Sequence, residues 1–390
     1  MKIARIWIFI FSLALVAGAV GYGANAADNR FLEIIHIDVG QGDATLVISP
    51  SGKTMLIDGG DTGRGNRVIM PLLKDRGIDS LDYIVATHYD ADHIGGLDEV
   101  MNHFQGRIGQ IFDRGRAGRK STPGSKAYAQ YIASGGLKRD RDPISLGSHG
   151  IILGEGITVW VVAVGGCVLG KGAKPIAANL DENSVSVAMV ISYGQFDYFI
   201  GGDLTGGGKS GRRRTPDIET AVGLVAGDID ILKLSHHGSE TSSNEIFLAA
   251  TTPEIAVVSV GNGGKNGRYH HPKRSVLSRL HDLNKASGFR HLYATNQGET
   301  DGGLKRRDQS LLTIANGHVT VRTDGSHYEV NKDWYMTDDT RARIAESKND
   351  ARTICGRPGV GNSATAVPVL PNSASGHRYQ TSSVLPGRKS

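Results

Sequence analysis

Short runs of β-branched and aromatic residues, separated by turns containing glycine, proline or asparagine, recur along the first half of the chain. Such runs predict strands, because alternate side chains of a strand pack on opposite faces of a sheet. We expect strands at residues 31–39, 44–48, 54–57, 82–87, 157–164, 184–193 and 196–200. Apolar residues at helical spacing predict helices around residues 68–73 and 94–104.

From about residue 216 the pattern alternates between helical and strand-like segments. We expect helices at residues 216–225, 243–250 and 273–286, and strands at 229–234, 255–260 and 291–294. Two further strands, 310–314 and 318–322, flank Asn316-Gly317, which is typical of a hairpin turn. Two sheets packed face to face, with helices outside, would bury all these segments, so we predict an α/β fold of the αββα sandwich type.

One internal segment does not fit either pattern. Residues 113–150 are polar, basic and rich in glycine, and they predict a long surface excursion with one short helix near residues 128–133. Beyond about Thr340, Pro, Ser, Gly and Ala dominate and the hydrophobic periodicity ends, so we predict a disordered tail over residues 341–390. A single folded domain would then occupy residues 27–340.

The N-terminus has the pattern of an export signal. Lys2 and Arg5 precede an apolar run over residues 6–20, and Ala24-Asn25-Ala26 fits the small-x-small cleavage pattern. We predict a signal peptide over residues 1–26 and a periplasmic or secreted protein that is not inserted in a membrane after cleavage. The alternative is an uncleaved membrane anchor, although the run is somewhat short to span a bilayer.

Charge is unevenly distributed along the chain. The formal net charge is +5, but the tail holds eight Lys and Arg against two Asp and Glu, so the body without signal and tail is net negative. Basic residues cluster locally at Arg114-Arg116-Arg119-Lys120, Arg212-Arg213-Arg214 and Lys305-Arg306-Arg307. These clusters could attract a polyanion or could be ordinary solvated loops.

The two cysteines, Cys167 and Cys355, do not have the spacing of a metal motif. In an oxidising compartment they could form a disulfide. They could equally remain two free thiols, and the sequence leaves both readings open.

Four candidate metal ligands lie within six residues, directly after an expected strand and before an expected helix. They are His88, Asp90, Asp92 and His93. Burying four such groups is costly unless a cation compensates them. Imidazole and carboxylate together suit zinc, manganese or iron. Further candidates follow other expected strands, namely Asp58, Asp203 and the pair His236-His237. Strand ends that meet at one edge of a sheet can hold such a site rigidly.

Seven motifs follow one another over residues 31–322. They are His36-Ile37-Asp38-Val39-Gly40-Gln41-Gly42-Asp43-Ala44, Asp58-Gly59-Gly60, His88-x-Asp90-x-Asp92-His93, Asn183-Ser184-Val185, Gly202-Asp203, His236-His237-Gly238-Ser239 and Asn266-x-x-Tyr269-x-His271-Pro272. In this order they resemble the extracellular hydrolase domain of ComEC-type DNA-uptake proteins, which has the metallo-β-lactamase fold. The resemblance implies that the metal ligands are His88, Asp90, Asp92, His93, Asp203 and either His236 or His237. It also implies that Asp203 bridges two metal positions. It implies that Asp58, Asn183 and Ser184 lie beside these ligands and orient them.

The sequence departs from the general pattern of the fold at two positions. Asp90 stands where the second histidine of His-x-His-x-Asp-His is expected, and Asn183-Ser184 occupies the stretch that usually supplies a middle histidine. Fewer imidazoles and harder ligands favour manganese or a loosely held second zinc, so we expect one or two Zn²⁺ or Mn²⁺ ions. The same departure argues against β-lactam hydrolysis.

The resemblance implies metal-assisted hydrolysis of a phosphodiester, with nucleic acid as a candidate substrate. Asp92 would take or steer the proton of the attacking water, and Tyr269 and His271 would hold a phosphoryl oxygen or protonate the leaving group. Two alternatives stay open, because fold alone does not fix chemistry. One is hydrolysis of a carboxylic ester, thioester or lactone, and the other is a non-catalytic module that binds a polymer.

Overall fold

The computed structural model describes residues 31–116, 124–134, 141–148, 150–210, 213–261 and 270–337, together with Cys355. The expected signal peptide and, apart from Cys355, the expected disordered tail lie outside these residues. Within them, no helix combines the length and the apolar character that crossing a membrane requires.

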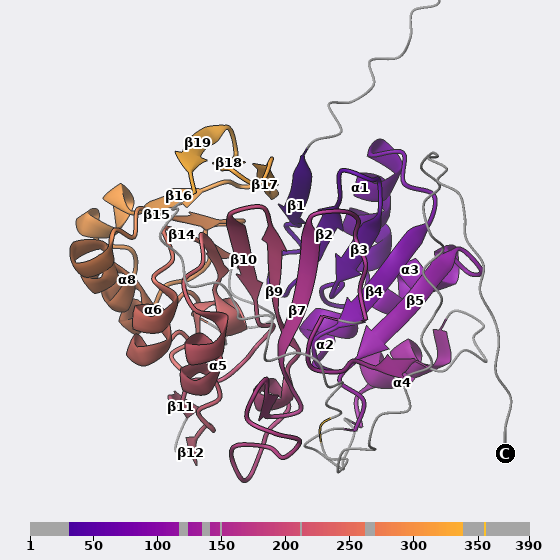
Figure 1. Cartoon of the computed structure of the whole chain (residues 1–390), viewed down its shortest axis with the longest axis horizontal. Coiled ribbons are helices and arrows are strands. Elements are labelled where there is room, and N and C mark those ends of the chain that lie inside the picture. The colour runs from indigo at the N-terminus through magenta and orange to yellow at the C-terminus, as the bar shows by residue number, and fades with distance from the viewer. Residues whose placement is uncertain are drawn as a thin grey trace, which may run out of the picture. The chain divides into compact units, whose positions relative to one another are not determined.

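The described strands form two large sheets (Figure 1). The first has the order β19-β18-β17-β1-β2-β3-β4-β5-β6. Its strands are β1 (Leu32–His36), β2 (Thr45–Ile48), β3 (Thr54–Ile57), β4 (Leu81–Ala86), β5 (Ile108–Asp113), β6 (Asp142–Pro143), β17 (Val319–Thr323), β18 (His327–Val330) and β19 (Asp333–Met336).

The second sheet has the order β16-β15-β14-β13-β10-β9-β7-β8. Its strands are β7 (Ile157–Val164), β8 (Cys167–Val168), β9 (Ala188–Tyr193), β10 (Phe196–Ile200), β13 (Ile231–Lys233), β14 (Ile255–Val258), β15 (His291–Ala294) and β16 (Leu312–Ile314). A separate two-stranded ribbon consists of β11 (Lys209–Ser210) and β12 (Arg213–Arg214).

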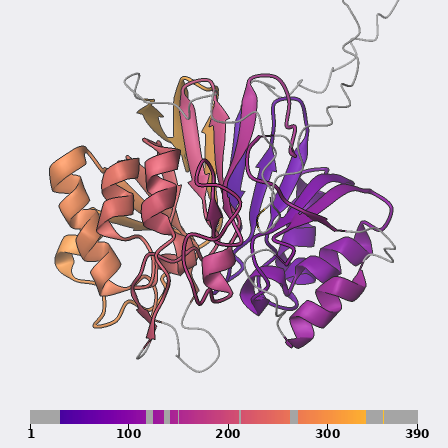
Figure 2. The same ribbon diagram turned by 60° about the horizontal axis from the view of Figure 1, so that its bottom comes forward.

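Helices cover the outer faces of the two sheets, as Figures 1 and 2 show from two directions. On the first sheet lie the π-helix η1 (Gly65–Ile69), α1 (Met70–Asp75), α2 (Ala91–Ile94), α3 (Leu97–His103) and α4 (Lys126–Ala133). On the second sheet lie α5 (Glu219–Ala226), α6 (Glu245–Thr251) and α8 (Arg274–Ser287). Three short 3-10 helices among the described residues are η3 (Asn183–Val185), η4 (Ser235–Gly238) and η5 (Arg306–Ser310). The sequence prediction of an αββα sandwich is confirmed.

The central strands β1, β2 and β3 of the first sheet are buried on both faces, which explains their nearly continuous apolar runs. In β1, Ile34 belongs to the core that includes the second sheet, whereas its neighbour Ile35 packs into the core beneath the helices. Val47 and Leu46 divide between the same two cores in β2. This alternation follows from the two-residue period of a strand.

The expected hairpin around Asn316-Gly317 is wrong. β16 pairs in parallel with β15 in the second sheet, whereas β17 pairs antiparallel with β1 in the first, with Ile34 opposite Val321. The turn, in which Asn316 has a φ of 49°, therefore carries the chain from one sheet to the other. A turn signal and two apolar runs predict strands, but they do not specify the partner of each strand.

The expected excursion over residues 113–150 also needs correction, because part of it belongs to the folded core. β6 pairs in parallel with β5, and Ile144 and Leu146 are buried in the core between the sheets. The expected helix over residues 94–104 is interrupted at Gly95-Gly96. A Cβ on Gly96 would lie 2.3 Å from the carbonyl oxygen of Gly59, so only glycine allows this approach.

The two cysteines form a disulfide that ties Cys355 to β8. Cys167 and Cys355 are 188 residues apart in sequence, and both are buried. Of the two readings that the sequence left open, the structure has the paired one.

Candidate metal centre

Candidate ligands follow the ends of parallel strands in both sheets. β3 and β4 are parallel neighbours in the first sheet, and β10 and β13 are parallel neighbours in the second. Asp58 follows β3 and His88 follows β4, while Asp203 follows β10 and His236-His237 follows β13. Because the carboxyl ends of parallel strands point the same way, the sandwich brings these residues together.

Close approaches hold the loops that carry the candidate ligands against one another. Gly202 has a φ of 53°, and a Cβ there would lie 2.6 Å from Thr87 Oγ1 on the first sheet. The N–H of His236 donates to the carbonyl of Gly202 over 3.0 Å. His236 and His237 both have left-handed backbone, with φ of 50° and 52°. Such strain in consecutive non-glycine residues is typical of functional sites, and here it turns both imidazoles toward Asp203.

The two carboxylate oxygens of Asp203 face two groups of side chains. One group, the His88 half-site, comprises His88, Asp90 and His236. His88 Nε2 and His236 Nε2 lie 3.9 and 3.6 Å from Asp203 Oδ2, and His88 Nε2 lies 3.7 Å from Asp90 Oδ2.

The other group, the His93 half-site, comprises Asp92, His93 and His237. His93 Nε2 and His237 Nε2 lie 3.1 and 3.7 Å from Asp203 Oδ1, and His237 Nε2 lies 3.3 Å from Asp92 Oδ2. Two ligands bound tetrahedrally at about 2.1 Å from a cation are roughly 3.4 Å apart, so the spacings in both half-sites suit a cation. The sequence left open which of His236 and His237 faces the site, and both do so, one toward each oxygen.

The far nitrogen of each buried imidazole is held by the protein. His93 Nδ1 lies 2.8 Å from Asp58 Oδ2, and Asp58 also accepts the backbone N–H and the hydroxyl of Thr87 over 2.8 and 2.6 Å. His237 Nδ1 lies 3.0 Å from the carbonyl oxygen of Ser259. These bonds place the proton on Nδ1 and leave Nε2 as the free lone pair, which is the tautomer that a metal ligand needs.

The inward-facing atoms are buried without a hydrogen bond. They are the Nε2 atoms of His88, His93 and His237 and Oδ1 of Asp203. Buried polar atoms without partners are uncommon and call for an explanation such as an ion. The Nδ1 atoms of His93 and His237 are hydrogen-bonded to the protein, whereas these unpartnered atoms converge on one place. This cluster of Asp and His is therefore compatible with a divalent metal ion.

The charges of the cluster are strongly coupled. Burial opposes a charge on His93, but the carboxylates of Asp203 and Asp58 outweigh it and raise the pKa of His93 well above its usual value. Burial likewise opposes the charge on Asp203, yet the imidazoles of His93, His236 and His237 lower the pKa of Asp203 well below its usual value. The site thus attracts positive charge, and a cation would compete with protons for it.

Asp43 and Lys233 belong to this region and were missed as site residues. One ligand atom each of Asp43, His93, Asp203 and His237 lies within 4.8 Å of the others. The carboxylate of Asp43, however, faces the Nδ1 atoms of His237 and His93 at 3.5 and 4.0 Å, on the side away from Asp203. The fully buried Lys233 donates its Nζ to Asp43 Oδ2. Asp43 therefore lies behind the ligands, and a polar residue inside an apolar strand, as Lys233 is, was the signal that could have revealed the pair.

The remaining residues expected beside the ligands divide into two kinds. Asn183 Nδ2 lies 3.3 Å from His236 Nε2, so its amide reaches the His88 half-site. The hydroxyl of Ser184 instead donates to the backbone carbonyl of Asp181, which makes Ser184 part of the turn rather than of the cluster. Asp90 and Asp92 are partly exposed, with 43 and 35% of their side chains accessible, and they line the open side of the site.

His271 lies beside the cluster, whereas Tyr269 lies outside the described residues. The ring centroid of His271 is 6.0 Å from that of His236 and 6.3 Å from that of His237. Burial, reinforced by His237 and His236, lowers the pKa of His271 to about 3. The imidazole is therefore neutral near pH 7, and it would act as a hydrogen-bond donor rather than as a cationic acid.

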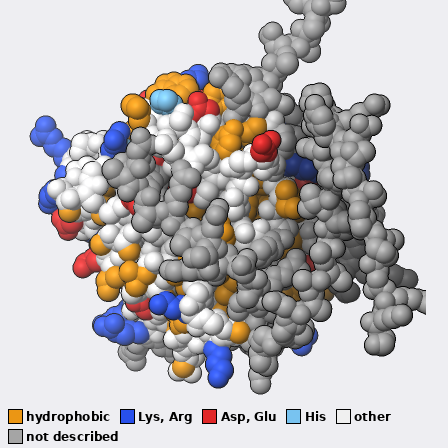
Figure 3. Space-filling view, in the orientation of Figure 1, with side chains coloured by type: hydrophobic (Ala, Val, Ile, Leu, Met, Phe, Trp, Pro, Cys, Tyr) orange, Lys and Arg blue, Asp and Glu red, His pale blue; other side chains and the backbone are white. Residues whose placement is uncertain are grey.

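The basic residues singled out in the sequence differ in how exposed they are. Figure 3 shows Lys and Arg side chains at separate points around the face that it draws. Arg116 and the run Lys305-Arg306-Arg307 are exposed, but Arg114 is fully buried in an ion pair with Glu182. Arg114 is therefore not available to attract a polyanion, which corrects its place in the first cluster.

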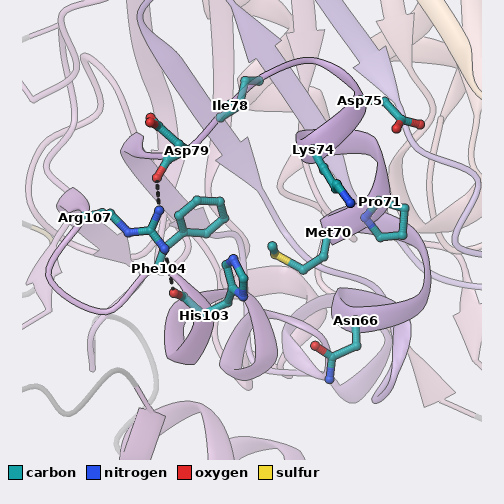
Figure 4. A pocket seen from close by; sticks show the side chains of 10 residues that line it. All are labelled: Asn66, Met70, Pro71, Lys74, Asp75, Ile78, Asp79, His103, Phe104 and Arg107. Atoms are coloured by element: carbon teal, nitrogen blue, oxygen red, sulfur yellow. Dashed lines mark hydrogen bonds between the residues drawn. The ribbon is translucent and has the colours of Figure 1, made fainter.

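A pocket of about 640 Å³ lies between η1–α1 and the end of α3 (Figure 4). Its wall includes Met70, Lys74 and Phe104, and Arg107 donates from Nη1 to the carbonyl oxygen of Asp79 over 2.6 Å. It shares no residue with the metal cluster, so it adds nothing to the chemistry of that centre.

Comparisons with known proteins agree with this geometry. The family model described as Metallo-beta-lactamase superfamily matches residues 37–262. The chain is 28% identical over 270 residues to ComE operon protein 3 of Bacillus subtilis (strain 168), covering 64% of this chain and 30% of the relative. It is 27% identical over 298 residues to Competence protein ComA of Neisseria gonorrhoeae, covering 76 and 36%. The chain thus spans about a third of the length of these relatives.

Among solved structures, the metallo-beta-lactamase fold protein YhfI from Bacillus subtilis is similar to this chain with a TM-score of 0.37 and 12% identity. The match covers 75% of this chain and 99% of that one.

Proposed function

Since this chain belongs to the metallo-beta-lactamase superfamily and to its ComEC-type subgroup, as its motifs indicated, we propose that it is an exported metal-dependent phosphodiesterase. The observation that carries the proposal is the convergence of buried, unpartnered Nε2 and carboxylate atoms on both sides of Asp203. A divalent ion bound there would supply Lewis acidity, lowering the pKa of a water to about 7 and offsetting negative charge on the substrate.

In this proposal Asp203 joins the two half-sites, one oxygen in each. His88, Asp90 and His236 complete one half-site, and Asp92, His93 and His237 complete the other. Zn²⁺ and Mn²⁺ both suit imidazole and carboxylate ligands, and the carboxylate-rich composition favours Mn²⁺ for at least one position.

The chain's own residues account for the rest of the chemistry. Asp92 is partly exposed, and its pKa is lowered because the nearby imidazoles of His237, at 3.3 Å, and His93 outweigh the effect of burial. Its carboxylate is thus ionised and placed to accept or steer the proton of an attacking water. The neutral imidazole of His271 donates a hydrogen bond to a phosphoryl oxygen, and Tyr269 shares that role.

Two features support a phosphodiester, with nucleic acid as the first candidate, over a carboxylic ester. A site with several carboxylates and two cations suits the in-line displacement of a phosphoryl group, whose charge is spread over several oxygens. The exposed Lys305-Arg306-Arg307 run offers positive charge for a polyanion.

We also propose that the protein acts in the periplasm or outside the cell. The export signal expected over residues 1–26 supports this location. The Cys167–Cys355 disulfide supports it as well, because disulfides persist in oxidising compartments.

The test is hydrolysis of bis(p-nitrophenyl) phosphate and of labelled single- and double-stranded DNA, by purified protein loaded with Mn²⁺ or Zn²⁺. Matched p-nitrophenyl acetate and lactone assays report on the alternative chemistry. We expect phosphodiester cleavage that His88→Ala abolishes. The control His103→Ala, which changes an exposed histidine on α3, retains activity.

Turnover of carboxylic esters alone would replace the proposal with an esterase or lactonase of the same fold. Tight binding of DNA without turnover under any metal would replace it with a polymer-binding module. Phosphodiester cleavage that survives His88→Ala would show that another site, or a contaminant, is responsible.

A further inference from the structure

Arg114 is fully buried, although it begins a segment rich in basic residues. Its Nε and Nη2 donate to Oε1 and Oε2 of Glu182 over 2.7 and 2.8 Å, and Nη1 donates to the carbonyl of Gly115 over 3.0 Å. The guanidinium carbon lies 4.1 Å from the ring centroid of Tyr89. Burying a guanidinium is costly, and a bidentate carboxylate with a stacked ring is the arrangement that offsets this cost.

The same ion pair holds two segments that carry the His88 half-site. Oε1 of Glu182 also accepts the backbone N–H of Tyr89 over 2.9 Å, and Tyr89 stands between His88 and Asp90. Glu182 directly precedes Asn183, whose amide reaches His236. Tyr89 follows β4 of the first sheet, and Glu182 lies shortly before β9 of the second. The bond between them therefore joins loops of different sheets.

The His93 half-site is supported from another direction. Asp58 bonds His93, and the carbonyl of Ser259 bonds His237. The Arg114 guanidinium contacts Tyr89, Glu182 and the carbonyl of Gly115. Tyr89 lies between His88 and Asp90, and Glu182 precedes Asn183. Asp58 reaches both half-sites, because the Thr87 hydroxyl that donates to it also lies 3.1 Å from His88 Nδ1. The Arg114–Glu182 pair, by contrast, contacts only the segments of the His88 half-site.

We propose that Arg114 and Glu182 are positioning residues that set the geometry of the His88 half-site, so that affinity for an ion there can be lowered while the His93 half-site is retained. This inference rests on the proposed metal-dependent function. Residues that orient metal ligands typically change metal affinity by about 10–100-fold when they are replaced.

The experiment measures Mn²⁺ binding to the full chain by calorimetry, with electron paramagnetic resonance to distinguish paired from isolated ions. We expect two ions in the wild type. In Arg114→Met one ion binds about 10–100-fold more weakly and the signal of the coupled pair is lost. The matched control Arg116→Met, which changes an exposed arginine two residues away, binds as the wild type does.

Repeating the measurement in two variants that each keep one half-site shows which of the two ions is weakened. In His237→Ala, where the ion of the His88 half-site remains, Arg114→Met weakens that ion. In His88→Ala, where the other ion remains, Arg114→Met leaves its affinity unchanged. A general structural role for Arg114 would instead weaken the remaining ion in both backgrounds.

Glu182→Gln keeps the shape of the side chain and removes its charge, so it gives the same pattern if Arg114→Met does not fold. Equal weakening of both ions, or normal binding of both in either variant, overturns the inference. A wild type that binds no ion overturns the proposed function and the inference together. A wild type that binds two ions beside an unaffected variant overturns the inference alone.

Discussion

Replacing Lys233 by methionine tests the buried charge pair behind the metal centre. Lys233 is fully buried in β13 of the second sheet, and Asp43, in the loop after β1 of the first sheet, is 2% exposed. Methionine keeps most of the volume of lysine and removes its charge. Asp43 would then be an unpaired carboxylate in the interior, which is one of the costliest defects that a single substitution can create.

The neighbours of Asp43 replace the lost ammonium group only in part, because the imidazoles of His237 and His93 attract its carboxylate without donating a hydrogen bond to it. The Nδ1 atoms of His237 and His93 are already bonded to Ser259 and Asp58. His36 is neutral, because burial, with Lys233 as the next cause, lowers its pKa to about 3, and the burial persists in the variant. We therefore expect Lys233→Met to lower the free energy of unfolding by about 3–5 kcal/mol.

The assay is urea denaturation of the metal-free proteins at pH 7, with Asp43→Asn and the double variant Asp43→Asn/Lys233→Met alongside. Because the double variant removes both charges, we expect it to recover most of the stability and to lie within roughly 1–2 kcal/mol of the wild type. A double variant as unstable as Lys233→Met, or a loss below about 1 kcal/mol in Lys233→Met itself, would refute the reasoning.

Three further outcomes follow from the structure. Asp203→Asn should weaken the binding of both ions, because the two oxygens of Asp203 face different half-sites. Metal content after dialysis checks this, and loss of one ion only would contradict a bridging role. Burial raises the pKa of Glu219 to about 8. Between about pH 4.5 and 8 the folded protein therefore keeps a proton on Glu219 that the unfolded chain releases, so the free energy of unfolding falls as the pH rises. Glu219→Gln should remove up to roughly 1.4 kcal/mol per pH unit from this decrease in stability, which thermal unfolding measured between about pH 4.5 and 8 would show. Parallel stability profiles of the variant and the wild type would exclude a raised pKa at Glu219. Cys167→Ser/Cys355→Ser should lower the free energy of unfolding by about 2–5 kcal/mol, because the disulfide closes a long loop, and an unchanged denaturation midpoint would contradict this.

The sequence by itself determined the elements and most of the candidate ligands. Short, nearly continuous apolar runs bounded by turn residues predicted β3, β7 and β10, because such runs are typical of strands that are buried on both faces. His88, Asp90, Asp92 and His93 were found because four polar ligands directly after a buried strand are unusual whatever the fold around them.

Only the tertiary structure decided which segments meet. Asn316-Gly317 looked like a hairpin turn, yet it connects different sheets, because the partner of a strand depends on packing over the whole chain. Arg114 looked like a surface cation because local composition does not reveal burial, and Glu182, which pairs with it, is far away in sequence.

Asp43 and Lys233 show the same limit, since they are far apart in sequence and their ion pair forms only where the two sheets face each other. Local patterns depend on the geometry of a few residues, whereas a buried charge needs a partner that only the folded chain can bring near.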